Sequence, residues 1–144
     1  MSTPKGVTLW LALWRVSRDI DRVAQADIAS HGLCLTDFGV LEVLLHRGPT
    51  RVNAIAETVM ITSGSMTTAV DRLEAKRLVR RTAHEGDARV RIVELTDAGR
   101  ALIEPAYSAH AKTIESVFSP LTAAERATLL HLLLKLRDTT RATA

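Results

Sequence analysis

Amphipathic helical periodicity runs through most of the chain and is interrupted in one place, between residues 78 and 95. Elsewhere, apolar side chains recur every three to five residues, which is the spacing of one face of an α-helix. In the interruption, "LVRRTA" (78–83) and "VRIVEL" (90–95) are short β-like runs, and the joining "HEGDAR" contains the turn formers Gly86 and Asp87. This pattern predicts a helical fold that carries a single β-hairpin.

Capping residues and breakers give the bounds of the helices. We predict six helices, which cover residues 7–30, 37–47, 51–59, 62–77, 97–117 and about 119–137. Their expected N-caps, after the first helix, are Thr36, Thr50, Thr62 or Ser63, Thr96 and Thr122. Glu125 follows Thr122 by three residues, which is the spacing of a capping box.

The length and composition fit one folded domain. A chain of 144 residues is near the usual size of a single domain and is long enough to bury a core. Hydrophobic residues make up 47% and charged residues 24%, which excludes a disordered or fibrous chain. Aromatic residues make up only 3%, a composition that suits packed helices better than a β-sandwich. We therefore predict a single domain over residues 1–144, mainly α with a small β-hairpin wing.

The third and fourth helices form a predicted helix-turn-helix. A tight break separates them, and the fourth helix has Met66, Val70 and Leu73 on its inner side. Its outward side carries small hydroxyl groups and one arginine, which allow close approach to a major groove of DNA. A solvated helix face with ordinary polar residues is the alternative. The predicted DNA contacts of this helix are Ser63, Ser65, Thr67, Thr68 and Arg72.

Basic residues are concentrated between Arg72 and Arg91, where seven of them stand against three acidic residues. The whole chain has a net charge of +3, so this window is the main basic patch. The hairpin in the window is placed to reach the neighbouring minor groove or the DNA backbone. We expect Arg89 to enter the groove, Asp87 to hold Arg89 by a bidentate pair, and Arg91 to contact a phosphate. A solvated turn whose charges cancel is the alternative.

Three stretches carry a resemblance to a known family: "LTDFGVLEVLLHRGP", "SGSMTTAVDRLEAKRLVRRT" and "GDARVRIVELTDAGRAL". The last contains the pattern D-x-R at residues 87–89, followed by L-T-x-x-G at residues 95–99. From Leu35 to Leu102 the chain resembles the winged helix-turn-helix of the MarR family of bacterial transcription regulators. Within that family, the stretches "LTDFGVLEVLLHRGP" and "TSGSMTTAVDRLE" resemble repressors that govern resistance to hydroquinones and catechols. Gly86 and Ala88 depart from the family pattern, since many relatives have an acidic residue and a second arginine there.

The resemblance implies a homodimer. Residues 35–96 would form the winged helix-turn-helix lobe, and residues 1–34 and 97–144 would supply interlocking dimerisation helices. The sequence also favours this assembly, because "LLHLLLKL" (129–136) holds more leucines than one apolar stripe needs and a short chain has little left to cover them. A helix buried from several sides in a monomer is the alternative. An isologous dimer predicts a pseudo-palindromic operator in double-stranded DNA, with half-sites about one helical turn apart.

The resemblance also implies a small effector, because MarR-like regulators commonly respond to aromatic or phenolic compounds in a cleft between the dimer helices and the DNA-binding lobe. The spacing of Trp10 and Trp14 is more typical of core or dimer packing. Cys34 is expected to be an inert buried thiol, with oxidant sensing as the alternative. The candidate ligand residues are Trp10, Trp14, Arg18, His31, His46 and Tyr107.

Other chemistries lack their motifs. The five histidines contain no H-x3-H pair and the chain has one cysteine, so we expect no metal, no cofactor and no internal disulfide. Catalytic and nucleotide-binding glycine motifs are absent, which predicts a protein that is not an enzyme. The sequence lacks a signal peptide, and "VTLWLALW" is too short to cross a bilayer, so we expect a cytoplasmic protein with no membrane contact.

Together these observations predict a homodimeric transcription regulator, expected to be a repressor, that releases its operator when a small aromatic effector binds. The alternative is a helical protein-binding adaptor whose basic patch meets an acidic partner. Sequence-selective protection of a palindrome would separate the two.

Overall fold

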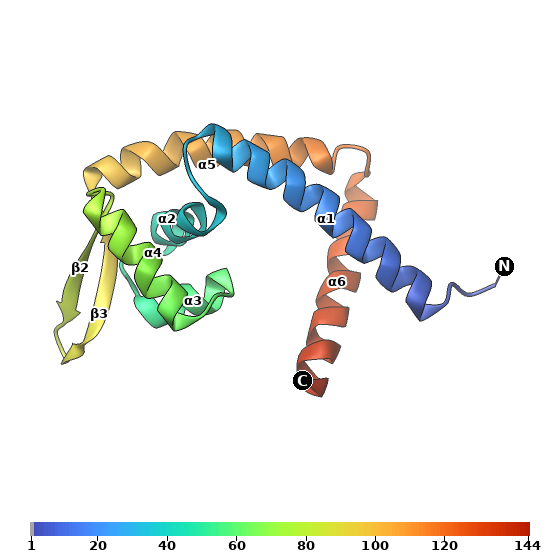
Figure 1. Ribbon diagram of the computed structural model, residues 1–144. Coiled ribbons are helices and arrows are strands. Elements are labelled where there is room, and N and C mark those ends of the chain that lie inside the picture. Colours follow the sequence, from blue (N-terminus) through green and yellow to red (C-terminus); the bar gives the residue numbers. More distant parts are fainter. Residues whose placement is uncertain (1) are drawn as a thin grey trace. The chain divides into compact units, whose positions relative to one another are not determined.

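The computed structural model describes residues 2–144 and divides into two compact units, with the boundary between Ala111 and Lys112. The fold class is mainly helical with a small antiparallel sheet, as predicted (Figure 1). α5 (Asp97–Val117) begins in the first unit and ends in the second, which also contains α6 (Ala123–Thr143). The other elements belong to the first unit: α1 (Gly6–Ser30), α2 (Leu35–Arg47), β1 (Thr50–Arg51), α3 (Val52–Val59), α4 (Ser63–Ala75), β2 (Val79–His84) and β3 (Asp87–Leu95).

The sheet has three strands where a two-stranded hairpin was predicted. Its order is β1-β3-β2, and both pairings are antiparallel. The hairpin is longer than expected, because β3 begins at Asp87 and closes the turn by pairing Asp87 with His84. The additional strand pairs Thr50 with Val93, whose side chain is fully buried. In Figure 1 the hairpin of β2 and β3 extends as an arm beside α4.

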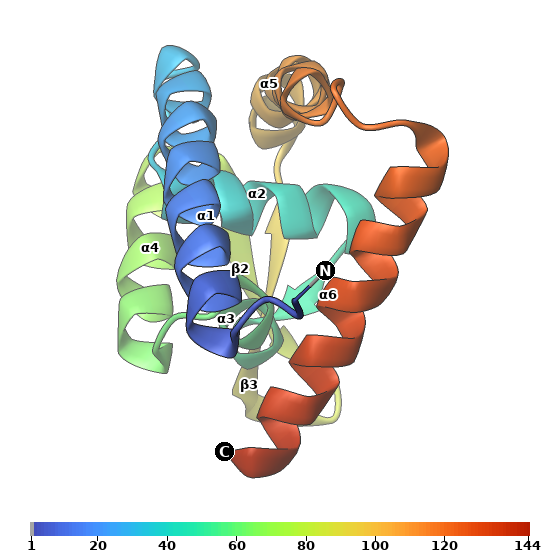
Figure 2. The same cartoon turned by 90° about the vertical axis from the view of Figure 1, so that its right-hand side faces the viewer.

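The core of the first unit gathers around α2, which buries Val40 and Leu41 completely. α1 meets α2 at a bend of 79°, and Figure 2 shows the two helices crossing steeply. Only the C-terminal end of α1 joins the core, through Ile28. α3, α4, the sheet and α5 supply the rest of the buried cluster, which includes Ile55, Ala56, Met66, Val70, Leu73, Val79, Val93, Ile103 and Ala106.

Three of the predicted N-caps are confirmed. The hydroxyl of Thr62 accepts a hydrogen bond from the backbone N–H of Ser65 at 3.2 Å. Thr96 accepts in the same way from Gly99 at 3.0 Å. Thr122 and Glu125 form the complete capping box at the start of α6.

Two predicted N-caps are wrong. α2 begins at Leu35, one residue before the expected cap Thr36, and no side chain caps it. Thr50 lies in β1 and its hydroxyl donates to the carbonyl oxygen of Gly48 at 2.8 Å, so the N-cap position of α3 falls to Arg51. In the second case pairing with β3 decides the backbone conformation, and this long-range contact outweighs the local capping preference.

Two helices expose much of their apolar surface. On α1, the exposed side chains include Trp10 at 62% and Trp14 at 48%. α6 buries none of its residues, and Leu130, Leu132 and Leu136 are each about half exposed or more. Within residues 2–144, no single helix is long and apolar enough to span a membrane, although the bent pair of α1 and α2 reaches that threshold by length and composition together.

Candidate nucleic-acid interface

α3 and α4 form the helix-turn-helix. α3 ends at Val59, and its C-cap residue Met60 adopts the left-handed conformation with φ 63°. The backbone N–H of Ile61 donates to the carbonyl oxygen of Ala56. The turn therefore needs only Met60, Ile61 and Thr62 before α4 begins. Met66 and Val70 are fully buried on the inner side of α4, as predicted. The opposite face leaves its hydroxyl-bearing residues exposed: Ser63, Ser65, Thr67 and Thr68.

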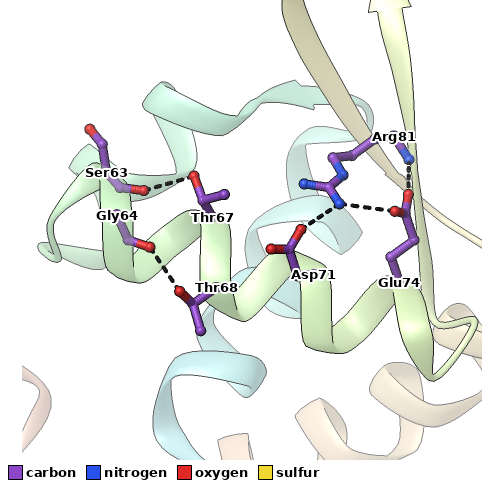
Figure 3. A network of polar contacts seen from close by, with 7 residues as sticks. All are labelled: Ser63, Gly64, Thr67, Thr68, Asp71, Glu74 and Arg81. Atoms are coloured by element: carbon purple, nitrogen blue, oxygen red, sulfur yellow. Dashed lines mark hydrogen bonds and ion pairs between the residues drawn. The ribbon is translucent and has the colours of Figure 1, made fainter.

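The hydroxyl groups of this face are not equivalent (Figure 3). Thr67 donates to the carbonyl oxygen of Ser63 at 3.0 Å, and Thr68 donates to that of Gly64 at 3.1 Å. The hydroxyl hydrogen of each threonine is therefore used within its own helix, and only the methyl group and the acceptor lone pairs of the side chain are available to a ligand. Ser65 accepts from the hydroxyl of Thr62 at 3.0 Å and keeps its own O–H as a donor.

Arg72 pairs with a carboxylate of another helix, although its side chain stays 41% exposed. Its Nε and Nη2 atoms donate to the two carboxylate oxygens of Asp37 at 3.1 and 2.5 Å. Asp37 is the one buried charged side chain of the described core and is only 2% exposed. Hydrogen bonding to Asp37 also raises the pKa of the Arg72 guanidinium above its ordinary value. Arg72 thus ties α4 to α2 and compensates a buried carboxylate, and its predicted contact with DNA stays a prediction.

A second arginine ties α4 to the hairpin. Nη2 of Arg81, on β2, lies 2.5 Å from Oδ1 of Asp71 and 3.0 Å from Oε1 of Glu74, and both acidic residues are on α4 (Figure 3). The backbone N–H of Arg81 also donates to Glu74 at 2.9 Å. These hydrogen bonds from Arg81 hold the pKa of the Glu74 carboxyl below its ordinary value. The helix and the wing are thus connected by charge-assisted contacts that sequence reasoning missed.

The wing presents Arg89 almost free of the protein. The side chain of Arg89 is 93% exposed, and its Nε lies 3.3 Å from one carboxylate oxygen of Asp87. The same oxygen accepts from the backbone N–H of Arg89 at 2.9 Å, so the predicted bidentate pair is wrong and Asp87 shapes the turn instead. Arg91 donates to the carbonyl oxygen of Ala88, a neutral acceptor that leaves its charge uncompensated.

Sequence reasoning also missed Arg51 and Asn53, at the start of α3. They line a surface pocket of about 310 Å³ together with Thr67, Arg81 and the two exposed wing arginines. One signal could have revealed Arg51. A basic residue at the N-terminal end of a helix with no acidic residue in its first turn opposes the helix dipole, which favours anions there.

The candidate ligand residues fall into separate groups. Arg18 lies over the ring of Trp14 with its Cζ 5.3 Å from the ring centroid, on the exposed face of α1. The rings of His46, on α2, and Tyr107, on α5, pack edge to face with their centroids 4.6 Å apart. Arg18 lines a shallow pocket with Asp21, Arg22 and Gln25, and none of the other five candidates lines that pocket.

His31 has a third environment. Its Nε2 is buried without a hydrogen-bond partner and lies 3.7 Å from Asp27, which also contacts Nδ1 of His110 at 2.8 Å. Among residues 2–144, no three His, Cys, Asp or Glu side chains are grouped as a metal site requires.

Cys34 is exposed, which corrects the expectation of a buried thiol. It occupies the N-cap position of α2, and Nη2 of Arg72 lies 3.9 Å from its sulfur. The corner between α1 and α2 therefore opens the thiol to solvent beside a guanidinium. Oxidant sensing by Cys34 stays a prediction.

A helix-turn-helix with an exposed hydroxyl face, followed by an arginine-bearing hairpin, defines the class of winged helix-turn-helix regulators. A model described as the MarR family matches residues 31–90. The chain is also 36% identical over 123 residues to the HTH-type transcriptional regulator MhqR of Bacillus subtilis, a match that covers 85% of each chain. The chain belongs to the MarR family, a family of transcription regulators rather than enzymes.

Solved structures agree with this assignment. A mutant MarR from E. coli, solved in complex with operator DNA, is similar with a TM-score of 0.79 and 26% identity, covering 89% of this chain and 92% of that one. BpsR of Bordetella bronchiseptica, whose DNA binding is regulated by 6-hydroxynicotinic acid, has a TM-score of 0.78 and 26% identity, covering 90% and 98%. The protein is therefore a DNA-binding transcription regulator, which favours DNA over the acidic protein partner of the adaptor hypothesis.

Proposed function

We propose that the protein is a homodimeric repressor that binds a pseudo-palindromic operator and releases it when a small aromatic compound binds. The observation that carries the DNA-binding part is that the molecule presents both the exposed hydroxyl face of α4 and, on the wing, the highly exposed side chain of Arg89. A major groove admits a helix with short side chains, and a narrow minor groove attracts a guanidinium.

Each contact has a role suited to its hydrogen bonding. Ser63 and Ser65 lie in the first turn of α4, where the helix dipole favours an anion, so they would bind backbone phosphates. Thr67 and Thr68 present methyl groups and acceptors, which suit the edges of thymine and of adenine or cytosine. Arg89 would occupy the minor groove.

Dimerisation is supported by the uncovered apolar surface. The exposed tryptophans of α1 and the leucines of α6 would each cost solvation free energy in an isolated chain. A second copy of the chain is the partner that would cover this surface, because MarR family regulators bind DNA as dimers. In an isologous dimer, the same surface of both copies is buried. The dimer would then carry two recognition helices, one for each half-site of the operator.

Regulation would act by population shift, because an effector that prefers a dimer with wrongly spaced recognition helices lowers operator affinity. The regulation of BpsR by an aromatic acid supports a compound of that kind here. Stacking on Trp14 beside Arg18, or contact with Tyr107 and His46, would suit a phenol or an aromatic acid. Trp10 and Trp14 are the only tryptophans, so their fluorescence reports an effector at α1 directly.

Operator selection from random duplexes tests the proposal, followed by affinity measurements on the selected site. Arg89→Ala should weaken binding by more than about tenfold with the dimer intact. Arg100→Ala is a matched control, because Arg100 is 52% exposed on α5 and pairs with Glu104 four residues away. Equal binding by wild type and Arg89→Ala would remove the wing from the mechanism.

The effector is tested on the same site with hydroquinone, catechol and 6-hydroxynicotinic acid as probes. Release of the operator by at least one of them is the expected result. A change in tryptophan fluorescence would place the effector at α1 rather than beside Tyr107 and His46. Undiminished operator binding in the presence of all three probes would contradict regulation by this class of compound.

A further inference from the structure

A surface pocket beside the wing is lined by four arginines. It has a volume of about 310 Å³ and lies where the start of α3, the middle of α4 and the two strands of the hairpin meet. None of its lining residues is acidic. Its polar lining comprises Arg51, Asn53, Thr67, Arg81, Arg89 and Arg91.

The four arginines differ in how much charge they leave free. Arg81 is committed to Asp71 and Glu74, so it contributes little net charge to the pocket. Arg89 shares a single long contact with Asp87, and Arg91 donates only to a backbone carbonyl. No carboxylate of residues 2–144 lies within 4 Å of the guanidinium of Arg51.

The backbone holds Arg51 at this position. It lies in β1, where it pairs with Ile92 of β3, and it is also the N-cap residue of α3. α3 therefore begins at the pocket, and its first turn contains no acidic side chain to oppose an incoming anion. Asn53, exposed in that first turn, adds an amide whose N–H groups can donate to an oxygen ligand.

We propose that this pocket binds one phosphodiester group of the DNA backbone, with Arg51 and Arg91 supplying charge and Asn53 a neutral hydrogen bond. The inference rests on the proposed function and extends the DNA interface from α4 and the wing to the start of α3. A phosphate held there fixes the register of the duplex without reading its bases. A free phosphorylated small molecule has the same chemistry, and the test below distinguishes it.

The test is the salt dependence of affinity for the selected operator. Replacing Arg51 by Gln should reduce the slope of log affinity against log salt by about one for each protomer bound, with base preference unchanged. Arg91→Gln should do the same, whereas Asn53→Ala should weaken binding at every salt concentration with the slope unchanged. Arg100→Gln is the charge-matched control, since Arg100 is exposed on α5 and does not line the pocket.

Thermal unfolding of each variant confirms that the fold is intact. An unchanged slope for Arg51→Gln and Arg91→Gln, with wild-type operator binding normal, would overturn the inference and leave the proposed function standing.

Inorganic phosphate is the probe for the other ligand source, a free phosphorylated small molecule. Phosphate binding that depends on Arg51, combined with an unchanged operator slope, would assign the pocket to a free ligand and overturn the inference. Failure of the wild type to select any sequence would overturn the proposed function as well.

Discussion

Gly99 shows that the family motif at residues 95–99 is architectural rather than a set of DNA contacts. Thr96 caps α5, donates its hydroxyl to the carbonyl oxygen of Arg77 at 2.7 Å, and donates its N–H to that of Leu78 at 3.1 Å. Gly99 lies about one helical turn after Thr96 and packs against the backbone of Leu78. A Cβ at Gly99 would overlap the carbonyl oxygen of Leu78 and lie 2.9 Å from its carbonyl carbon. The motif therefore fixes α5 to the end of α4 and the base of the wing.

Gly99→Ala should lower the free energy of unfolding by about 2–3 kcal/mol, because backbone atoms cannot move aside as a flexible side chain would. Gly64→Ala is the control, since Gly64 is also helical and a Cβ there meets nothing within 4 Å. That variant should be neutral or stabilised by up to about 1 kcal/mol. Chemical denaturation measures both, and wild-type stability for Gly99→Ala would refute the close approach.

The arginines of the basic window show why counting charges misleads at the scale of single residues. Arg72, Arg80 and Arg81 are each paired with a carboxylate of another element. These ion pairs hold elements of the fold together, and the paired charges add little to the positive electrostatic potential outside the molecule. The cations left for a polyanion include Arg89 and Arg91, and Arg51 outside the window joins them.

At the scale of elements, α4 is held from two sides by ion pairs. Arg72 connects it to α2 through Asp37, and Arg81 connects β2 to it through Asp71 and Glu74. Both sets of contacts come from residues near its C-terminal half, which leaves the N-terminal half free for a ligand. We infer that these pairs set the angle between the recognition helix and the wing.

Glu74→Gln tests the connection to the wing through its pH dependence. Arg81 holds the pKa of folded Glu74 below that of an unfolded glutamate, so the stabilisation is present above the unfolded pKa and is lost as pH falls through the folded pKa. Because Glu74 is partly exposed and screened, the substitution should cost only about 0.5 kcal/mol near pH 7.

The stability difference between wild type and Glu74→Gln should therefore narrow when unfolding is measured at about pH 3. Glu85→Gln, in the exposed turn of the hairpin, is the control and should show no such narrowing. A difference that is constant between the two pH values would contradict the role given to the Arg81 contact.

Local signals predicted most of the elements, and long-range pairing accounts for the errors. Thr62 and Thr96 were predictable as caps because a cap depends on the next three residues alone. The role of Thr50 was not predictable, since it depends on β3, more than 40 residues away. The same limit explains Arg72, whose partner Asp37 lies 35 residues earlier in the chain. The site was therefore predicted as a surface, while the contacts that position it were not.

At the scale of the whole molecule, the account depends on a second copy of the chain covering α1 and α6. Replacing Leu132 and Leu136 together by Glu should convert the dimer to a monomer of 15.7 kDa in light scattering and abolish cooperative operator binding. The helix should survive, because α6 buries no residue within the chain. Asp138→Lys, on the other side of α6, is the control and should stay dimeric. A dimer that persists in the double variant would exclude this face from the interface.

Genomic footprinting of the purified protein, with and without a phenolic probe, tests the central claim most directly. The account predicts a small set of protected sites that share a pseudo-palindrome, with half-sites about one helical turn apart, and protection that fades when the probe is added. Uniform protection that follows only salt concentration, or no protection at all, would contradict a sequence-specific regulator built on α4 and the wing.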